Sequence, residues 1–350
     1  MTKRSFLRAV PAWGFPILAL GLALCTGGCT SVPPRLPTAK VPKATATPSS
    51  PITFFPLPNP IIDPGLILAG PDGTVWFADI YTNHIGRSTT SGTISVFPAL
   101  PIAGRADLQE MAVGPDGAVW FTEGTPNAVG RITIQGAVTA FPLPSAKSRP
   151  TGISLGADGA LWFAETDGNR IGRITTSGHI TEFPLPRPNS GPRSITAGPD
   201  GALWFTEGAA NRIGRITTTG TVTDFPVPTA ASLLADITPG PDGALWFTEQ
   251  GANQIGRITT SGTVTEFPLH SPGSEPIGIT AGHDGALWFA KIAPEYISSR
   301  GIGRITPQGQ ITEFPLPDEN SIVLDIATAP DGTIWFTDKG LDQIGRISGG

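Results

Sequence analysis

The chain has 350 residues, of which 39% are hydrophobic and 15% are charged, and its formal net charge is −5. A chain of this length and hydrophobic content can bury a large core, and its 44 Gly and 37 Pro fit a protein with a turn every few residues. Because no cluster of Lys and Arg forms a basic stripe, we expect no nucleic-acid partner.

Residues 1–28 form a predicted export signal. Three basic residues precede an apolar run over 15–25, which is too short for a membrane span. Small residues stand immediately before Cys29, and this ending is similar to a bacterial lipoprotein box, in which Cys29 would be lipidated. Thr26 stands where such boxes usually have Leu, so ordinary secretion remains the alternative. We expect an exported bacterial envelope protein, on the periplasmic or extracellular side, that meets the membrane only through this lipid.

Residues 30–51 are rich in Pro, Ala, Thr and Ser and lack the apolar content to fold, so they form a predicted disordered linker. Cys25 and Cys29 are the only cysteines of the chain. The predicted folded domain, residues 52–350, therefore has no disulfide and no thiol chemistry.

Seven Trp residues define a repeat across this domain. Each stands in a D-G-[AT]-[VLI]-W-F phrase, and four of the six intervals between them are 42 residues. The residues are Trp76, Trp120, Trp162, Trp204, Trp246, Trp288 and Trp335. A period in the forties with one Trp and one Gly-bounded turn per unit is typical of a β-propeller. We therefore predict an all-β fold of seven four-stranded antiparallel blades.

The fifth unit illustrates the expected blade. A first strand over 237–240 ends at a Pro-Asp-Gly turn, and a second strand covers 244–249. A third strand covers 253–259. After a Ser-Gly turn, a fourth covers 263–267 and stops at Pro268. The unit is therefore predicted to be an antiparallel meander.

The two ends of the repeat complement each other. Residues 52–58 carry an extra fourth-strand phrase ahead of the first unit, whereas the last unit stops at 347–350 without one. We expect 52–58 to pair with the strand around 344–347 in the last blade and to close the ring. Since a closed ring has no obligatory partner edge, we expect a monomer.

Residues that recur in every unit are interpreted as scaffold. The seven Arg of the [IV]-G-R phrases form a potential anion-binding ring, but an Arg present in every blade is better explained by a contact that every blade needs, such as a bridge to strand or turn carbonyls. The Trp-Phe pair is predicted to be inter-blade core. The four histidines show no zinc-binding spacing. They are His84, His179, His270 and His283.

Three phrases resemble the virginiamycin B lyase family: G-P-D-G-A-L-W-F-T-E over 240–249, N-R-I-G-R-I over 211–216 and T-E-F-P-L over 265–269. The resemblance spans residues 52–350. It implies a seven-bladed propeller. The named member of the family inactivates an antibiotic, since it opens streptogramin B rings by elimination with a divalent metal, typically Mg²⁺.

The chemistry of that family rests on Glu-Pro-His-Gly at the start of an innermost strand, a second His one blade earlier, and a Glu that ends the following W-F-T-E strand. Carried over, the first Glu falls on Glu275, whereas the two His positions hold Ile277 and Ala235 and the second Glu position holds Lys291. Ile and Ala neither accept a proton nor bind a metal, and Lys puts a cation beside the metal site. Lyase chemistry by that mechanism is expected to fail here.

Other polar residues fall at the same predicted end of the channel, because a meander places the start of strand one and the end of strand two on one face. The candidates for ligand binding are Asp63, Asp79, Asp107, Gln109, Glu123, Arg149, Arg193 and Glu275. The sixth unit also carries five extra residues, around 294–297, at this end. A solvated rim and a polar ligand site across blades one to four are both open interpretations.

The leading hypothesis is an exported propeller that binds a small molecule, a peptide or an envelope partner at its channel mouth and is not an efficient lyase. One rival is a Mg²⁺-dependent lyase or hydrolase that uses Asp63 with Asp79, or Asp107 with Glu123, as carboxylate pairs. A second rival is a structural protein of the cell envelope.

Overall fold

The computed structural model describes residues 52–58, 63–80, 82–89, 91–100, 107–294 and 299–347. The predicted signal peptide, Cys29, the linker over 30–51 and residues 295–297 of the extra loop lie outside these ranges. Within the ranges that are described, no helix has the length and apolar content to cross a membrane.

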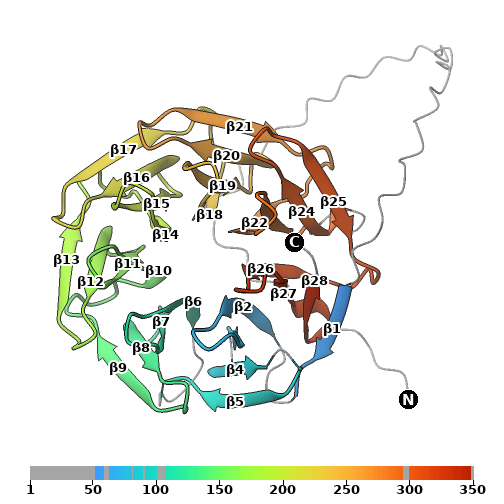
Figure 1. The fold of residues 1–350 in the computed structure, drawn as a ribbon. Helices are drawn as coiled ribbons and strands as arrows, with labels where there is room; N and C mark the ends of the chain where they lie inside the picture. The colour runs from blue at the N-terminus through green and yellow to red at the C-terminus, as the bar shows by residue number, and fades with distance from the viewer. Residues whose placement is uncertain are drawn as a thin grey trace, which may run out of the picture. The chain divides into compact units, whose positions relative to one another are not determined.

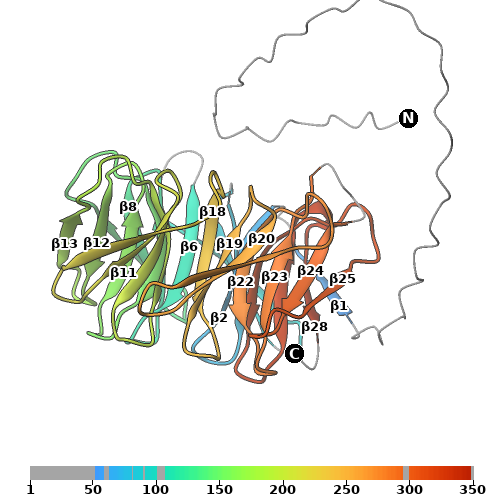
Figure 2. The same ribbon diagram turned by 90° about the horizontal axis from the view of Figure 1, so that it is seen from above.

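Seven four-stranded antiparallel sheets form a ring, so the predicted seven-bladed propeller is confirmed (Figure 1). The first strand of each blade faces the axis of the ring and the fourth lies at the outside, and Figure 2 shows the blades from the side. Blades one to three are β2 (Pro64–Ala69), β3 (Val75–Asp79), β4 (His84–Ser88) and β5 (Ile94–Pro98); β6 (Leu108–Val113), β7 (Val119–Glu123), β8 (Ala128–Ile132) and β9 (Val138–Pro142); and β10 (Pro150–Leu155), β11 (Leu161–Glu165), β12 (Arg170–Ile174) and β13 (Ile180–Pro184).

Blades four to six continue in chain order. They are β14 (Pro192–Ala197), β15 (Leu203–Glu207), β16 (Arg212–Ile216) and β17 (Val222–Pro226); β18 (Leu234–Pro239), β19 (Leu245–Glu249), β20 (Gln254–Ile258) and β21 (Val264–Pro268); and β22 (Pro276–Ala281), β23 (Leu287–Lys291), β24 (Gly301–Ile305) and β25 (Ile311–Pro315). Blade seven combines β26 (Val323–Thr328), β27 (Ile334–Asp338) and β28 (Gln343–Ile347) with β1 (Ile52–Pro56), and a short 3-10 helix, η2 (Lys339–Leu341), follows β27.

The N-terminal strand closes the ring, as predicted. β1 pairs antiparallel with β28, with Thr53 opposite Arg346 and Phe55 opposite Ile344. The ring of Phe55 also packs against Trp335, with 5.4 Å between ring centroids. Figure 1 shows β1 at the outer edge of blade seven. The last blade thus takes its outer strand from the other end of the domain.

Aromatic side chains join each blade to the next. Trp120 of blade two lies in one buried cluster with Phe163 of blade three, and Trp335 of blade seven lies in one with Phe77 of blade one. These Trp and Phe side chains are almost fully buried. The Trp-Phe pair is therefore inter-blade core, as predicted, and its burial supplies a large part of the hydrophobic stabilisation.

The glycine of each I-G-R phrase makes room for this core. A Cβ added to Gly172 would lie 2.2 Å from the ring of Phe163 on the neighbouring strand. No side chain fits at that distance, so the close approach of strand and ring requires glycine.

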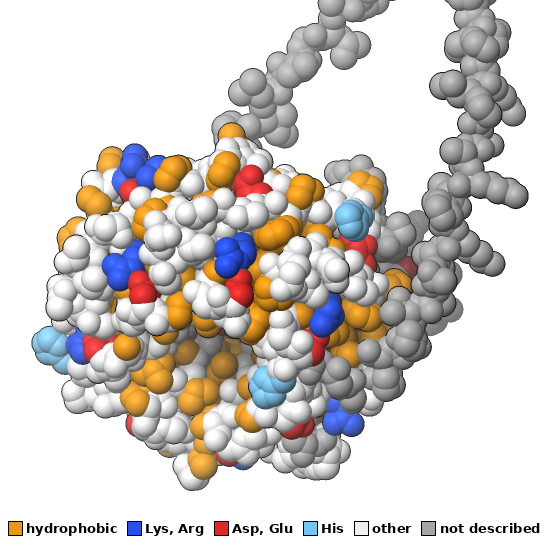
Figure 3. Space-filling model, turned by 45° about the horizontal axis from the view of Figure 1, so that its top comes forward, with side chains coloured by type: hydrophobic (Ala, Val, Ile, Leu, Met, Phe, Trp, Pro, Cys, Tyr) orange, Lys and Arg blue, Asp and Glu red, His pale blue; other side chains and the backbone are white. Residues whose placement is uncertain are grey.

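The repeated Arg residues are scaffold. Arg173 Nε donates to Asp158 Oδ2 at 2.6 Å, Trp162 Nε1 donates to Asp158 Oδ1 at 3.0 Å, and the guanidinium lies over the Trp162 ring. The acceptor of this arginine is thus the carboxylate of the turn. The expected contact with a carbonyl of the neighbouring blade is seen for Arg87, whose Nη1 donates to the Ile134 carbonyl at 3.4 Å. Equivalent pairs recur in other blades, and Figure 3 shows Lys and Arg side chains lying beside Asp and Glu on the face in view. These ion pairs hold each Pro-Asp-Gly-type turn against the third strand of its blade.

The innermost strands begin earlier than the sequence pattern predicts. In blade five, β18 starts at Leu234 rather than at Ile237. Leu234 lies opposite Glu249 and Ile237 opposite Phe247, so one extra residue bulges from the inner strand. The same register shift occurs near the start of all seven innermost strands. The bulge breaks the two-residue alternation that marked strands in the sequence.

Candidate functional site

The bulges build a candidate site at the end of the ring where the innermost strands start. We call this end the mouth and define it by three sets of residues. The rim set precedes each strand: Asp63, Asp107, Arg149, Gly191, Leu233, Glu275 and Ile322. The second set is Gly65, Gln109, Thr151, Arg193, Ala235, Ile277 and Leu324. The third set is Leu66, Glu110, Gly152, Ser194, Asp236, Gly278 and Asp325.

Threonines of the W-F-T phrases hold the bulges in place. Thr248 Oγ1 accepts the Asp236 N–H of its own blade at 3.0 Å and donates to the Ile277 carbonyl of the next blade at 2.7 Å. Thr122 donates likewise to the Thr151 carbonyl. These buried hydroxyls join neighbouring blades at the backbone of the bulge. The backbone of the mouth is therefore held in the same bulged conformation from blade to blade, while the side chains on it differ.

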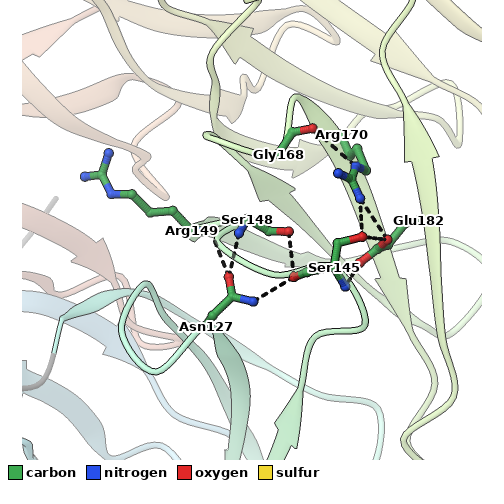
Figure 4. Close-up of polar contacts among 7 residues, drawn as sticks. All are labelled: Asn127, Ser145, Ser148, Arg149, Gly168, Arg170 and Glu182. Carbon is green, nitrogen blue, oxygen red and sulfur yellow. Dashed lines mark hydrogen bonds and ion pairs between the residues drawn. The ribbon is translucent and has the colours of Figure 1, made fainter.

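Three of the rim residues adopt a strained backbone. Arg149, Leu233 and Glu275 have φ of 51°, 49° and 45°, in the left-handed region. Asn127 supports the first of them, because its Oδ1 accepts the N–H of Ser148 at 2.8 Å and of Arg149 at 3.0 Å (Figure 4). Such strain persists only where the surroundings enforce it, and it often marks functional positions.

Figure 4 shows where the side chain of Arg149 points. On one side of the Asn127 turn, Arg170 pairs with Glu182 on the outer strands, with 3.1 Å between Nη1 and Oε2. Arg149 extends in the opposite direction, away from this pair. Of the two arginines, Arg149 is the one that belongs to the rim set, and its Nη1 lies 4.0 Å from Asp167 Oδ1.

The two predicted carboxylate pairs, Asp63 with Asp79 and Asp107 with Glu123, lie at the mouth end of blades one and two. Asp79 is buried and its Oδ2 accepts the Asp63 N–H at 3.2 Å, and Lys339 Nζ lies 3.4 Å from Asp63 Oδ1. Asp107 Oδ1 accepts Gln109 Nε2 at 2.5 Å. Burial raises the pKa of Glu123 to about 7, and the negative charge of Asp107 adds to the rise.

The carboxylates that end the second strands lie beneath the surface. Glu123, Glu165 and Glu249 are fully buried, and burial raises the pKa of each to about 7. Nearby hydroxyls, such as Ser148 beside Glu165, offset only part of this rise. They are on the predicted face but do not form an open acidic rim.

Lys291 makes an internal ion pair. Its Nζ lies 3.3 Å from Glu313 Oε2 and its side chain is only 3% exposed. Burial lowers the pKa of Lys291, and the negative charge of Glu313 opposes that shift. The side chain is directed toward β25, so it neither enters the mouth nor offers a ligand for a metal.

The positions that correspond to the family motif come together between blades five and six. Glu275 Oε2 accepts Gln250 Nε2 at 3.2 Å on the rim. Ala235 and Ile277 occupy the bulges of two neighbouring inner strands. None of the three mouth sets contains a histidine within the described residues.

This set of donors does not fit Mg²⁺. Across the ranges that the structure covers, no three His, Cys, Asp or Glu side chains are grouped closely enough to hold a metal ion. At the family position, Glu275 accepts the Gln250 amide, and the second carboxylate is replaced by the paired Lys291. Mg²⁺ requires several oxygen ligands in octahedral geometry.

The sequence analysis did not identify three acidic residues of the mouth. Glu110, Asp236 and Asp325 stand at third positions of the bulges in blades two, five and seven. Enclosure by the ring raises the pKa of Glu110, and the negative charges of Asp325 and Asp236 raise it further. Asp236 and Asp325 each accept a backbone N–H of the next inner strand, from Ile279 at 2.9 Å and Ile67 at 2.8 Å. Comparing the third positions across units would have revealed them.

The comparison with family models identifies the fold family. The model of the virginiamycin B lyase family matches residues 39–189 and 165–350. The chain belongs to this family. The resemblance inferred from the repeat phrases is thus confirmed, and it extends over the whole propeller.

Solved structures of virginiamycin B lyases are similar to this propeller. A structure of streptogramin B lyase is 40% identical over 85% of this chain and 97% of that chain, with a TM-score of 0.79. A catalytically inactive His-to-Ala variant of virginiamycin B lyase from Staphylococcus aureus with quinupristin is 41% identical over 85% of this chain and 98% of that chain, with a TM-score of 0.78. Hydrazine synthase from Kuenenia stuttgartiensis, at 17% identity and a TM-score of 0.68, shares the fold alone. No curated protein sequence matched the chain.

Proposed function

We propose that this member of the virginiamycin B lyase family binds a ligand at the mouth of its channel and does not open streptogramin B rings by the elimination of its relatives. The proposal depends on one observation: the bulged inner strands are present, but two side chains that they carry differ from those that the family resemblance implies. Ala235 and Ile277 stand on bulges held by the threonine hydroxyls, at the two positions where the family resemblance calls for histidine.

The chemistry of elimination supports this view. Elimination needs a base within hydrogen-bond reach of the proton to be removed, and the side chains of Ala235 and Ile277 have no basic atom. Lys291 is tied to Glu313. A relative 41% identical to this chain is catalytically inactive as a His-to-Ala variant, which fits a requirement for histidine in the family.

Export and anchoring remain part of the proposal. A monomeric propeller held to a bacterial envelope membrane through lipidated Cys29 would present its mouth to small molecules, peptides or envelope components. Replacement of Cys29 with Ala should move the protein from the membrane fraction to the soluble exported fraction. If the wild-type protein is already soluble outside the cell, the lipid anchor is wrong.

Binding at the mouth is tested by thermal unfolding of the full-length protein with a library of small molecules and short peptides. A compound that binds only the folded state raises the Tm. Ile277→Trp fills the mouth and should abolish the rise, whereas Ser177→Trp, on a turn at the other end of the blade, should not. If no compound stabilises the protein, or if the rise survives in the Ile277→Trp variant, the mouth is not the binding site.

A second candidate function is a metal-dependent enzyme at Asp107 and Glu123. The observation in its favour is the mutual repulsion of these carboxylates, which a cation between them would relieve. Mg²⁺ would then raise the Tm of the wild-type protein and not that of Asp107→Ala. We expect Mg²⁺ to leave both unchanged.

A further inference from the structure

The loop that joins blades three and four borders a cavity on the outer surface of the ring. The cavity has a volume of about 300 Å³ and is lined by Pro186, Arg187, Pro188 and Asp224. The first three residues follow β13, and Asp224 lies on the outer strand β17. Cavities that hold small organic molecules begin at about this size. None of the four residues belongs to the three mouth sets, so this cavity is distinct from the ligand site proposed there.

Arg187 differs from the residues at the same place in other loops between blades. At the equivalent positions that the structure describes, the residues are Ser145, Thr229, Ser271 and Asp318. Ser145, for example, donates its hydroxyl to Glu182 on the outer strand of the next blade at 2.6 Å. In the loop between blades three and four, a guanidinium group takes the place of that hydroxyl.

Two arginines share the carboxylate of Asp224. Arg212 on β16 donates from Nε to Asp224 Oδ2 at 2.7 Å and from Nη2 to Oδ1 at 3.1 Å, which is a bidentate ion pair. Arg187 donates from Nε to the same Oδ2 at 3.2 Å. Burial acts to raise the pKa of Asp224, but the hydrogen bonds from Arg212 and Arg187 lower it overall. Two positive charges therefore face one negative charge.

Arg187 is the cation that the cavity offers to a ligand. Its side chain is 49% exposed, whereas that of Arg212 is 20% exposed. Since Arg212 already balances the charge of Asp224, the charge of Arg187 is in excess. Glu207 lies opposite Arg212 on β15, but burial raises its pKa and the charge of Asp224 raises it further, so its ionised form is disfavoured. A guanidinium has five N–H donors, and the pair with Asp224 uses the one on Nε.

Pro186 and Pro188 give the cavity an apolar wall. Both are exposed, and a proline on each side of Arg187 restricts the backbone of the loop. The Arg187 carbonyl also accepts Asn169 Nδ2 at 2.9 Å and Ser190 Oγ at 3.0 Å. Because the loop backbone is already fixed, a ligand that binds there orders little of it. The cavity thus combines a cation with an apolar surface.

We propose that this cavity binds a small organic carboxylate, whose oxygens accept hydrogen bonds from the Nη groups of Arg187 and whose apolar part lies against Pro186 and Pro188. The planar guanidinium group matches a carboxylate in a bidentate manner. The nearby carboxylate of Asp224 repels an anion of higher charge, such as a phosphate, more than a singly charged one. The proposal does not depend on ligand binding at the mouth.

A matched pair of probes tests the inference on the full-length protein by fluorine NMR. Fluorobenzoate carries one carboxylate on an aromatic ring, and fluorobenzamide has the same ring without the charge. We expect saturable broadening of the fluorobenzoate signal, with an affinity at least about 10-fold higher than that of fluorobenzamide, and we expect NaCl to weaken the binding. Acetate, which has the charge without the ring, should displace fluorobenzoate at least about 10-fold less well than benzoate does.

Variants locate the site. Arg187→Gln should weaken fluorobenzoate binding about 10-fold or more, while Arg187→Lys keeps the charge without the planar fork and should retain part of the affinity. Lys147→Gln removes the same charge from an exposed position of the loop before β10 and should leave the affinity unchanged. Ile277→Trp, which fills the mouth, should also leave it unchanged. An unchanged circular dichroism spectrum confirms that each variant folds.

The outcomes separate this site from the mouth. Loss of binding in Arg187→Gln, with full binding in Lys147→Gln and Ile277→Trp, would support the proposal. If fluorobenzoate does not bind, binds no better than fluorobenzamide, or keeps its wild-type affinity in Arg187→Gln, the proposal is wrong and ligand binding at the mouth is unaffected. If Ile277→Trp abolishes binding, the carboxylate binds at the mouth, which overturns the outer site and supports the proposed function.

Discussion

Lys291 on β23 and Glu313 on β25 form an ion pair within blade six, with 3.3 Å between Nζ and Oε2. In blades three and four the acidic residue of the fourth strand forms an ion pair with an arginine of the third strand, as Glu182 does with Arg170. In blade six that position is Gly301, which has a φ of 139°, and a Cβ added there would lie 2.3 Å from the Phe314 carbonyl oxygen, so no side chain fits. In blade six the cation is Lys291 on the second strand, at the position where the family resemblance implies a glutamate.

Lys291→Glu should therefore destabilise the protein without creating a lyase. The new carboxylate would face Glu313 with no cation between them, at a cost of about 3 kcal/mol in the free energy of unfolding. Lys291→Glu combined with Glu313→Gln removes the repulsion and should recover most of the loss. Chemical denaturation of the three proteins measures this. Equal stability of Lys291→Glu and the wild type would show that the ion pair is unimportant.

Deletion of residues 52–58 should cost far more stability than seven residues suggest. The deletion leaves β28 with an unpaired edge and removes the packing of Phe55 against Trp335. We expect a loss of more than about 3 kcal/mol and aggregation on heating. Thr53→Ala, at an exposed site of the same strand, is the control. A deletion variant with the wild-type Tm would contradict the closure role of β1.

Thr248→Val should loosen the bulges of blades five and six. It removes one hydroxyl that accepts the Asp236 N–H and donates to the Ile277 carbonyl in a buried site. The expected loss is about 1–3 kcal/mol, with faster amide hydrogen exchange at Asp236. Thr265→Val, on the exposed face of β21, should be nearly neutral. Matching losses in the two variants would argue against a specific role for the Thr248 hydroxyl.

The stability of the propeller should fall as the pH rises from about 4.5 to about 7. The folded-state pKa values of Glu123, Glu165 and Glu249 are raised from 4.5 to about 7 by burial, so the folded state holds these protons more tightly than the unfolded state. Their contribution is complete below pH 4.5 and is lost through pH 7. Thermal unfolding should give a higher Tm at pH 5 than at pH 8.

Glu165→Gln provides the control for this pH dependence. The amide keeps the shape of the protonated acid and cannot ionise, so the variant should lose part of the slope and be more stable than the wild type at pH 8. A Tm that is constant or that rises between pH 5 and pH 8 would show that the buried glutamates do not govern stability in this range.

The fold was predictable because the repeat carries it. The spacing of the Trp residues indicated seven blades, and the unmatched phrase at 52–58 indicated how the ring closes. The bulges were not predictable from one unit, since the extra residue at 235–236 breaks the alternation that identifies a strand. For this reason the sequence pattern predicts a first strand from Ile237, three residues after its start at Leu234.

The candidate site was predictable in position but not in its electrostatics. The rim and second positions, including Arg149, Arg193 and Glu275, could be aligned from unit to unit. The third positions, Glu110, Asp236 and Asp325, were missed because an alternating strand would point them away from the channel. Burial of Glu123 depends on packing between blades, which a single sequence does not reveal.

We propose that this propeller keeps the fold of the virginiamycin B lyases and has lost their elimination chemistry. The most direct test incubates the full-length protein with a streptogramin B, with and without Mg²⁺, and follows products by liquid chromatography and mass spectrometry. We expect the substrate to remain intact, in contrast to an active virginiamycin B lyase run in parallel. A new product of unchanged mass that requires Mg²⁺ would demonstrate elimination and contradict the account.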